Sequence, residues 1–183
     1  MKINKLIVFI LLSICSSIYS EPVNITYANN NTIFYIEWPT NITKSIYKHP
    51  TFNDVNIEVY TGNDENNSIA YGLTIYRIPE KYGELSNDYI NILLTETMNS
   101  QIKTIDTIYN INHEIIENYE ENINNNYIKS TKLIRHINII LYGYYKSIYS
   151  DRYFVSLWSN GIDTKENRIM QNNFIDGIEI RIK

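Results

Sequence analysis

The sequence predicts an α+β fold in which one central antiparallel β-sheet is flanked by two main helices. Three observations indicate this class. Segments with an apolar period of two dominate the chain, one stretch between them has a helical period, and a second capped stretch lies near the C-terminus. No internal repeat and no linker rich in Gly, Pro or Ser divides the 183 residues. We therefore expect a single folded domain.

The first half of the chain predicts a strand followed by a β-hairpin. Residues 32–39, TIFYIEWP, are rich in aromatic and β-branched residues and end at a proline, which is typical of a strand end. Residues 55–62 alternate apolar and polar side chains, as a half-buried strand does. The turn sequence NDENN separates this strand from residues 68–79, which a second proline closes.

The period changes at Ser86. From Ser86 to about Lys103, apolar residues recur at helical spacing, Ser86 is a suitable N-cap, and Asp88 lies in the first turn, where the helix dipole favours a carboxylate. Strand patterns then return as a four-strand meander at residues 112–119, 127–134, 137–148 and 152–158. The third of these, which contains INIILYGYY, is apolar on both faces, as a central strand is expected to be.

A second helix is expected near the C-terminus. The dipeptide NG at 160–161 predicts the end of the sheet, and Asp163 with Glu166 predicts a capping box for a helix that runs to about Phe174. Gly177 closes this helix, and IEIRI alternates as a last strand. The predicted order does not determine how the strands are arranged within the sheet.

The N-terminal segment is predicted to direct export. Two lysines precede the apolar run LIVFILLSIC, which at ten residues is about half as long as a membrane-spanning helix. Small residues follow, so the pattern is that of a secretory signal peptide at residues 1–20, with cleavage after Ser20 and a mature domain at 21–183. The alternative is a lipoprotein anchored at Cys15, although Ile14 is a poor match to the small residue required before such a cysteine.

Cleavage after Ser20 would leave a soluble periplasmic or secreted domain without cysteine. Such a chain carries 14 Lys and Arg against 20 Asp and Glu, a formal charge of −6. This balance argues against general affinity for nucleic acids or anionic membranes, which depend on clustered basic residues. No later stretch is long and uncharged enough to span a membrane, so the mature chain should contain no membrane span.

Several features occur in an order that is similar to that of the PsbP-like superfamily. An aromatic strand ending at WP, a helix after the first hairpin, and the meander YGYYKSIYSDRYFVSLW precede a terminal helix with NNFIDGIEI. The superfamily includes a photosystem extrinsic subunit, a Ran-binding relative and many exported bacterial proteins. The resemblance implies an α/β/α sandwich and a binding or accessory role. It supplies no site residue, and export argues against a Ran-related role.

Local motifs predict no catalytic residues, no cofactor and no metal site. HEIIE at 113–117 has Glu117 where a zinc protease needs a second histidine, and as a strand it directs His113 and Glu114 to opposite faces. Residues 64–75 lack the glycine and the glutamate of a calcium loop. No serine lies in a nucleophile elbow, and no glycine-rich phosphate loop occurs.

The one basic cluster, Lys129, Lys132 and Arg135 followed by His136, is split by strand geometry. Lys129 and Arg135 should share one face of the strand, and Lys132 should lie on the other. We expect a solvated edge rather than a phosphate-binding site, because the domain is acidic overall.

Aromatic residues crowd the last predicted hairpin and are the candidate binding residues. Exposed aromatic rows bind sugars or proteins, whereas the alternative is that these rings fill core and rim positions with their hydroxyls outward. Tyr142 and Tyr144 should share one face and Tyr145 the other. The candidates are Tyr142, Tyr144, Tyr145, Tyr149, Tyr153 and Trp158.

Two classes of function remain. The first is a non-catalytic exported module that binds a protein or a small ligand through an aromatic patch or a sheet face. The second is a hydrolase whose site is assembled from scattered residues, in a pocket where His113 or His136 meets a carboxylate such as Glu114, Glu117 or Asp151.

Overall fold

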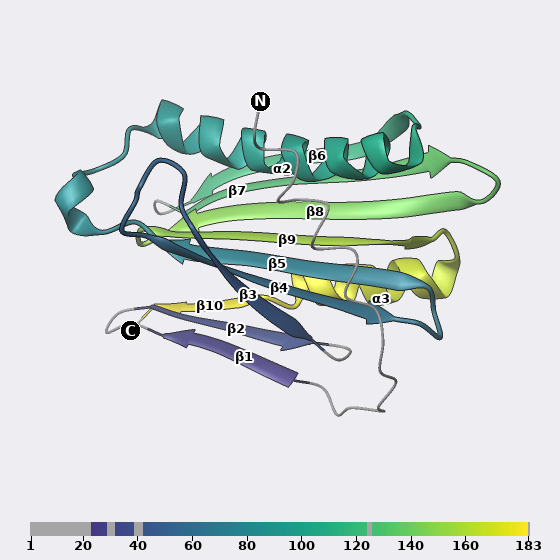
Figure 1. Cartoon of the computed structure of the whole chain (residues 1–183), viewed down its shortest axis with the longest axis horizontal. Coiled ribbons are helices and arrows are strands. Elements are labelled where there is room, and N and C mark those ends of the chain that lie inside the picture. Colours follow the sequence, from purple (N-terminus) through teal and green to yellow (C-terminus); the bar gives the residue numbers. More distant parts are fainter. Residues whose placement is uncertain (1–22, 29–31, 39–41, 124–125, 183) are drawn as a thin grey trace.

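The computed structural model describes residues 23–182, except 29–31, 39–41 and 124–125. A seven-stranded, entirely antiparallel sheet forms the centre of the molecule, in the order β3-β4-β5-β9-β8-β7-β6 (Figure 1). Its strands are β3 Thr43–Lys48, β4 Asn56–Asp64, β5 Ile69–Arg77, β6 His113–Ile123, β7 Asn126–His136, β8 Ile140–Ser150 and β9 Tyr153–Ile162.

A second sheet was not predicted. It has three antiparallel strands in the order β1-β2-β10, namely β1 Val23–Ala28, β2 Thr32–Trp38 and β10 Glu179–Ile182. It therefore joins the two ends of the described chain, since the C-terminal strand pairs with β2. The predicted strand at 32–39 and the predicted last strand belong to this sheet rather than to the central one.

The helices cover opposite faces of the central sheet. Helix α2, Asn87–Tyr109, lies over one face, and helix α3, Lys165–Asp176, packs on the other face together with the small sheet. A short 3₁₀ helix, η2 Glu80–Tyr82, precedes α2. The α/β/α sandwich implied by the family resemblance is confirmed, with the small sheet as an addition.

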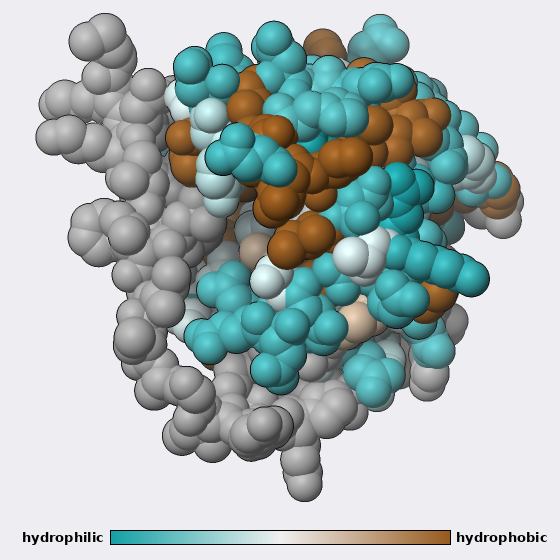
Figure 2. Space-filling view, turned by 90° about the vertical axis from the view of Figure 1, so that its right-hand side faces the viewer, coloured by the Kyte–Doolittle hydropathy of each residue, from teal (hydrophilic) through white to brown (hydrophobic). Residues whose placement is uncertain are grey.

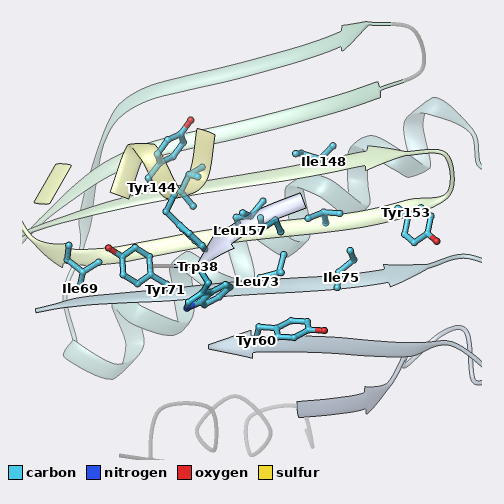
Figure 3. Close-up of a cluster of buried hydrophobic side chains, with 14 of the residues drawn as sticks. Trp38, Tyr60, Ile69, Tyr71, Leu73, Ile75, Tyr144, Ile148, Tyr153 and Leu157 are labelled. Carbon is cyan, nitrogen blue, oxygen red and sulfur yellow. The ribbon is translucent and has the colours of Figure 1, made fainter. Parts of the chain in front are cut away.

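Alternation along the strands creates the two cores. Tyr71, Leu73 and Leu157 point to the α3 face and meet Trp38 of β2, as Figure 3 shows. Phe174 of α3 lies edge-on to Trp38 and to Tyr71, with ring centroids 4.9 Å apart in both pairs. The opposite face packs against one side of α2, whose buried residues are Ile90, Leu94, Met98, Ile102 and Ile105. Trp38 thus attaches the small sheet to the rest of the domain.

The start of the first predicted helix is confirmed, and its end is later than predicted. The Ser86 side chain accepts a hydrogen bond from the Tyr89 backbone N–H at 3.2 Å, as an N-cap does. The helix continues past Lys103 because the apolar period continues through Ile105, and Asn110 in the left-handed conformation (φ 51°) ends it.

The predicted cap of the second helix was wrong by one residue. Thr164, rather than Asp163, is the N-cap, because its hydroxyl accepts a hydrogen bond from the Asn167 backbone N–H at 3.1 Å. Asp163 instead forms an ion pair with Arg168. Gly177 ends this helix, as predicted.

The hairpin and the meander are confirmed, but two details differ. Asn160 and Gly161 do not end the sheet, because both lie within β9 and pair with Gly143 and Tyr142 of β8. The short strand β3 was not predicted, since TKSIYK has little apolar alternation. The apolar strand β8 is an interior strand, as expected.

The predicted signal peptide at 1–20 and the alternative anchor at Cys15 lie outside the described residues. Within the described ranges, no helix is both long enough and apolar enough to cross a membrane.

Candidate functional site

A groove of about 630 Å³ lies between α2 and the hairpin formed by β6 and β7. The helix contributes one wall, and residues of β6 and β7 form the other side. Its size is within the range of sites that bind small molecules. It is lined by Thr95, Met98, Asn99, Ile102, Lys103 and Asp106 of α2, by His113, Ile115, Asn118, Tyr119 and Glu120 of β6, and by Lys129, Ser130 and Thr131 of β7.

A buried arginine lies behind the groove. The Arg135 side chain has no exposed surface, and its Nε donates to Asp106 Oδ1 at 2.7 Å. Its two terminal nitrogens donate to Asn160 Oδ1, to the Ile102 carbonyl and to the Tyr145 hydroxyl, at 3.0, 3.2 and 3.1 Å respectively. The guanidinium is therefore bonded from two strands, β8 and β9, and from α2 at once, which fixes its position.

This network also requires a glycine and a protonated phenol. The Tyr145 hydroxyl donates to Asn160 Oδ1 at 2.7 Å, and burial raises the pKa of this hydroxyl, so the donor keeps its proton. A Cβ on Gly143 would lie 2.8 Å from Asn160 Oδ1 and 3.0 Å from an Arg135 nitrogen. Gly143 thus leaves the space that the guanidinium and the amide occupy.

The network presents a histidine to the groove. Asp106 Oδ2 lies 2.7 Å from His113 Nδ1, while Oδ1 of the same carboxylate is held by Arg135. With Nδ1 occupied by the carboxylate, Nε2 is the nitrogen left for a ligand or a water molecule. The His113 side chain is 29% exposed, so the imidazole is accessible at the groove.

The remaining charges of the groove are partly paired. Lys129 Nζ donates to Thr95 Oγ1 at 3.0 Å and lies 3.2 Å from a Glu120 oxygen. Asn118 Oδ1 accepts from the Thr131 hydroxyl at 2.8 Å, which leaves its amide nitrogen for another acceptor. Within the described ranges, Lys103 and Asn99 make no polar side-chain contact. The groove therefore offers several hydrogen-bond donors beside the apolar side chains of Met98 and Ile102.

The aromatic candidates do not form one surface. Tyr142, Tyr144 and Tyr153 are buried on the α3 face, and the Tyr142 and Tyr144 hydroxyls donate to Asn172 and Asp176 of α3, at 2.9 and 2.7 Å. Tyr145, Tyr149 and the half-buried Trp158 lie on the α2 face. The split of Tyr142 and Tyr144 from Tyr145 is as predicted, and all five tyrosines occupy core positions. A binding role for this set stays a prediction.

The basic cluster was only partly predicted. Lys129 and Arg135 point toward α2 and Lys132 points away, as expected, and Lys132 pairs with Glu117 at 3.0 Å. The expectation of a solvated edge was wrong for Arg135, which is fully buried because Asp106 compensates its charge. His136 is exposed at the end of β7.

The HEIIE segment is a strand, as predicted, with a bulge between Ile115 and Glu117. His113 does meet a carboxylate, but the partner is Asp106 of α2 rather than Glu114, Glu117 or Asp151. Asp106 and Asn160 were not identified as site residues from the sequence. The only sequence signal for Asp106 is its place beside the apolar face of α2, between Ile105 and Thr107. In the described part of the chain, no group of three or more His, Cys, Asp or Glu residues is arranged to hold a metal ion.

Comparisons with known proteins show the fold. No protein-family model matches the sequence, and no curated protein matches it. The solution structure of cyanobacterial PsbP (CyanoP) from Synechocystis sp. PCC 6803 is similar, with a TM-score of 0.52 and 10% identity over 92% of this chain and 98% of that chain. The chain therefore has the PsbP-like fold. A protein of unknown function, PA94 from Pseudomonas aeruginosa, matches more weakly, with a TM-score of 0.36 and 10% identity over 70% of this chain and 94% of that chain.

Proposed function

We propose that the chain is an exported, non-catalytic binding module whose ligand occupies the groove between α2 and the β6–β7 hairpin. The observation that carries the proposal is the Arg135 network, which holds Asp106 and His113 at the wall of this groove. Burying a guanidinium has a high desolvation cost, and apolar residues of similar volume often stabilise a core equally well. A role in positioning His113 gives this buried charge a functional reason.

The surroundings suit a small polar ligand. Met98 and Ile102 of α2 provide apolar contact, while Asn99, Lys103 and His113 offer donors. Sites of this size usually combine a largely apolar lining with a few polar groups that fix the orientation of the ligand. The similarity to CyanoP supports the fold of such a module and does not indicate its ligand.

A ligand screen with a groove-filling variant tests the proposal. Saturation-transfer NMR would be run on the purified chain with a panel of carboxylic acids, amino acids and sugar phosphates. Asn99→Trp places a large ring in the groove, and Ile92→Trp places the same ring on α2 at an exposed position that does not line it. Compounds that lose their signal with N99W but keep it with I92W support the proposal. If every binding compound behaves alike in both variants, the groove is not the site.

A hydrolase is the second candidate, because the His113–Asp106 pair has the geometry of an oriented general base. In such a reaction the free Nε2 of His113 would accept a proton from an attacking water molecule. Among the described residues, no side chain is hydrogen-bonded to that nitrogen, so no side-chain nucleophile is paired with it as a catalytic serine is with its histidine. For this reason catalysis ranks below binding.

Ester and phosphate hydrolysis distinguish the two candidates. p-Nitrophenyl acetate and p-nitrophenyl phosphate would be tested with His113→Gln and with the exposed His136→Gln as its matched control. An enzyme should lose at least about 100-fold in rate with H113Q and nothing with H136Q. Equal background rates in all three proteins would support the binding role.

Export is part of the proposal and is supported by the N-terminal sequence alone. Fractionation of the native cells, with mass spectrometry of the mature N-terminus, tests it. A chain that begins near Glu21 and is free of membranes supports signal-peptide cleavage, and an acylated Cys15 would establish the lipoprotein alternative. An intact Met1 in the cytosol would overturn export.

A further inference from the structure

Strand β6 is an unusually open edge of the central sheet. It is eleven residues long, and among the described strands only β7 pairs with it, so within that part of the chain one row of its backbone N–H and C=O groups has no partner in the central sheet. Ten of its residues are exposed. Among them are four large apolar or aromatic side chains that are about half exposed, namely Ile115, Ile116, Tyr119 and Ile123. Long edge strands with apolar side chains are templates for pairing with another chain.

The opposite edge does not have these properties. Strand β3 has only six residues and carries Lys44 and Lys48, and short, lysine-bearing edges are protected against pairing. Lys44 also lies 2.9 Å from Glu58 of the neighbouring strand. The two edges of the same sheet therefore differ in length and in the sign of their charge.

The charges of β6 are all acidic and lie largely on one face. The register with β7 places Glu114, Glu117 and Glu121 on the face that points away from α2, where they oppose Ile134, Lys132 and Ile128. Glu117 pairs with Lys132, and Tyr119 hydrogen-bonds to Glu121. Within the described ranges, Glu114 has no partner. β6 itself contains no Lys or Arg.

The apolar surface continues beyond the first residues of β6. Exposed isoleucines of the β7–β8 turn, Ile137 and Ile139, and Ile108 near the end of α2 lie at the same end of the molecule. Figure 2 shows hydrophobic side chains gathered in a band on this end. A partner that lies along β6 would extend onto this apolar surface.

We propose that β6 binds an extended basic peptide of a partner protein, which adds an eighth strand to the sheet. Lys or Arg at alternate positions of the peptide face Glu114, Glu117 and Glu121, and apolar residues at the intervening positions face Ile115. A second copy of this chain fits less well, because it would bring two acidic strands together. The edge shares Ile115 and Tyr119 with the groove lining, but the peptide pairs with the β6 backbone rather than entering the groove, and the inference does not depend on the proposed function.

The test uses a capped seven-residue peptide of alternating lysine and valine, and an acidic counterpart with glutamate in place of lysine. Fluorescence anisotropy measures affinity for the purified chain, and hydrogen exchange with mass spectrometry locates the protected amides. The variant Glu114→Lys/Glu121→Lys reverses two charges of the edge. Its matched control, Glu65→Lys/Glu96→Lys, makes the same change in net charge at exposed positions outside β6.

The expected result has three parts. First, the basic peptide binds and the acidic peptide does not. Second, amide exchange slows in β6 and not in β3. Third, E114K/E121K weakens binding of the basic peptide about tenfold or more, while the control variant changes it less than about twofold. Circular dichroism confirms that each variant is folded. Binding without slower exchange in β6, equal loss in both variants, or no binding at about 1 mM peptide would each overturn the inference. N99W alters the α2 wall of the groove and not β6, so it should leave peptide binding unchanged, which separates peptide binding at β6 from ligand binding in the groove.

Discussion

Replacing Asp106 by alanine should destabilise the protein far more than the loss of an ordinary surface ion pair. Arg135 has no exposed side-chain surface, so its charge cannot be solvated when the carboxylate is removed. The remaining acceptors are neutral: the Asn160 amide, the Ile102 carbonyl and the Tyr145 hydroxyl. An unpaired buried charge costs several kcal/mol in a folded protein.

The magnitude follows from the geometry. Breaking a buried ion pair by removing one partner costs about 3–5 kcal/mol. The Asp106 side chain is 17% exposed, so water can enter part of the space it leaves, and the lower end of the range, about 3 kcal/mol, is expected. In a domain of this size that loss lowers Tm by roughly 6–12 °C.

Urea unfolding followed by circular dichroism measures the loss directly. Glu117→Ala is the matched control, because it removes a carboxylate from a lysine pair at the exposed edge, where the Glu117 side chain is 53% exposed. This control should change the free energy of unfolding by about 0–1 kcal/mol. The two variants remove the same charge and differ in the burial of the partner.

A double-mutant cycle decides whether the pair itself is responsible. Asp106→Ala and Arg135→Met together should cost at least about 2 kcal/mol less than the sum of the single changes, because the double variant has no unpaired buried charge. Additive losses, or a D106A loss below about 1 kcal/mol, would refute the interpretation of Arg135 as a buried charge held by Asp106.

Three further predictions concern the scaffold. The pKa of His49 is lowered by burial, and its Nδ1 accepts the Thr51 and Phe52 backbone N–H groups at 3.1 Å. The unfolded chain therefore takes up the proton more readily, and the free energy of unfolding should fall as the pH decreases below about 6.5. Urea midpoints across this pH range check it, and His49→Asn should remove the dependence. Thr164→Ala should cost about 1 kcal/mol of unfolding free energy, because it removes the N-cap of α3. Gly72→Ala would place a Cβ 2.0 Å from the Trp158 ring, so the indole must move, and a shift in tryptophan fluorescence together with a lower Tm is expected.

Most of the central sheet could be predicted because the apolar residues of its strands follow recognisable strand patterns in the sequence. β4 follows a strand pattern with apolar and polar alternation, and β8 is apolar on both faces, so local pattern and tertiary position agree. β3 could not be predicted, because TKSIYK alternates weakly and acquires its strand geometry by pairing with β4. The prediction that the NG dipeptide at 160–161 ends the sheet was wrong because tertiary pairing overrides the local turn signal. β9 continues through Asn160 and Gly161 because β5 and β8 pair with it on both sides.

The candidate site could be predicted only in part, because it is formed by residues far apart in sequence. The chain distances from Asp106 to Arg135 and from Arg135 to Asn160 are 29 and 25 residues. His113 was singled out from the HEIIE segment, but its carboxylate partner was sought along the strand rather than on the preceding helix. The later end of α2 matters here, since a helix that ended at Lys103 would not include Asp106 at all.

The turn after α2 links the scaffold to the groove. Asn110 ends the helix in the left-handed conformation, and the Ile111 N–H then donates to the Asp106 carbonyl at 3.0 Å, which reverses the chain within one turn. That reversal brings His113, the first residue of β6, back to the carboxylate seven residues earlier. Arg135 stands opposite His113 in the register of β6 with β7, so the same carboxylate meets both side chains. The position of the histidine is therefore determined jointly by a helix cap and a strand register, and a change to either should displace it.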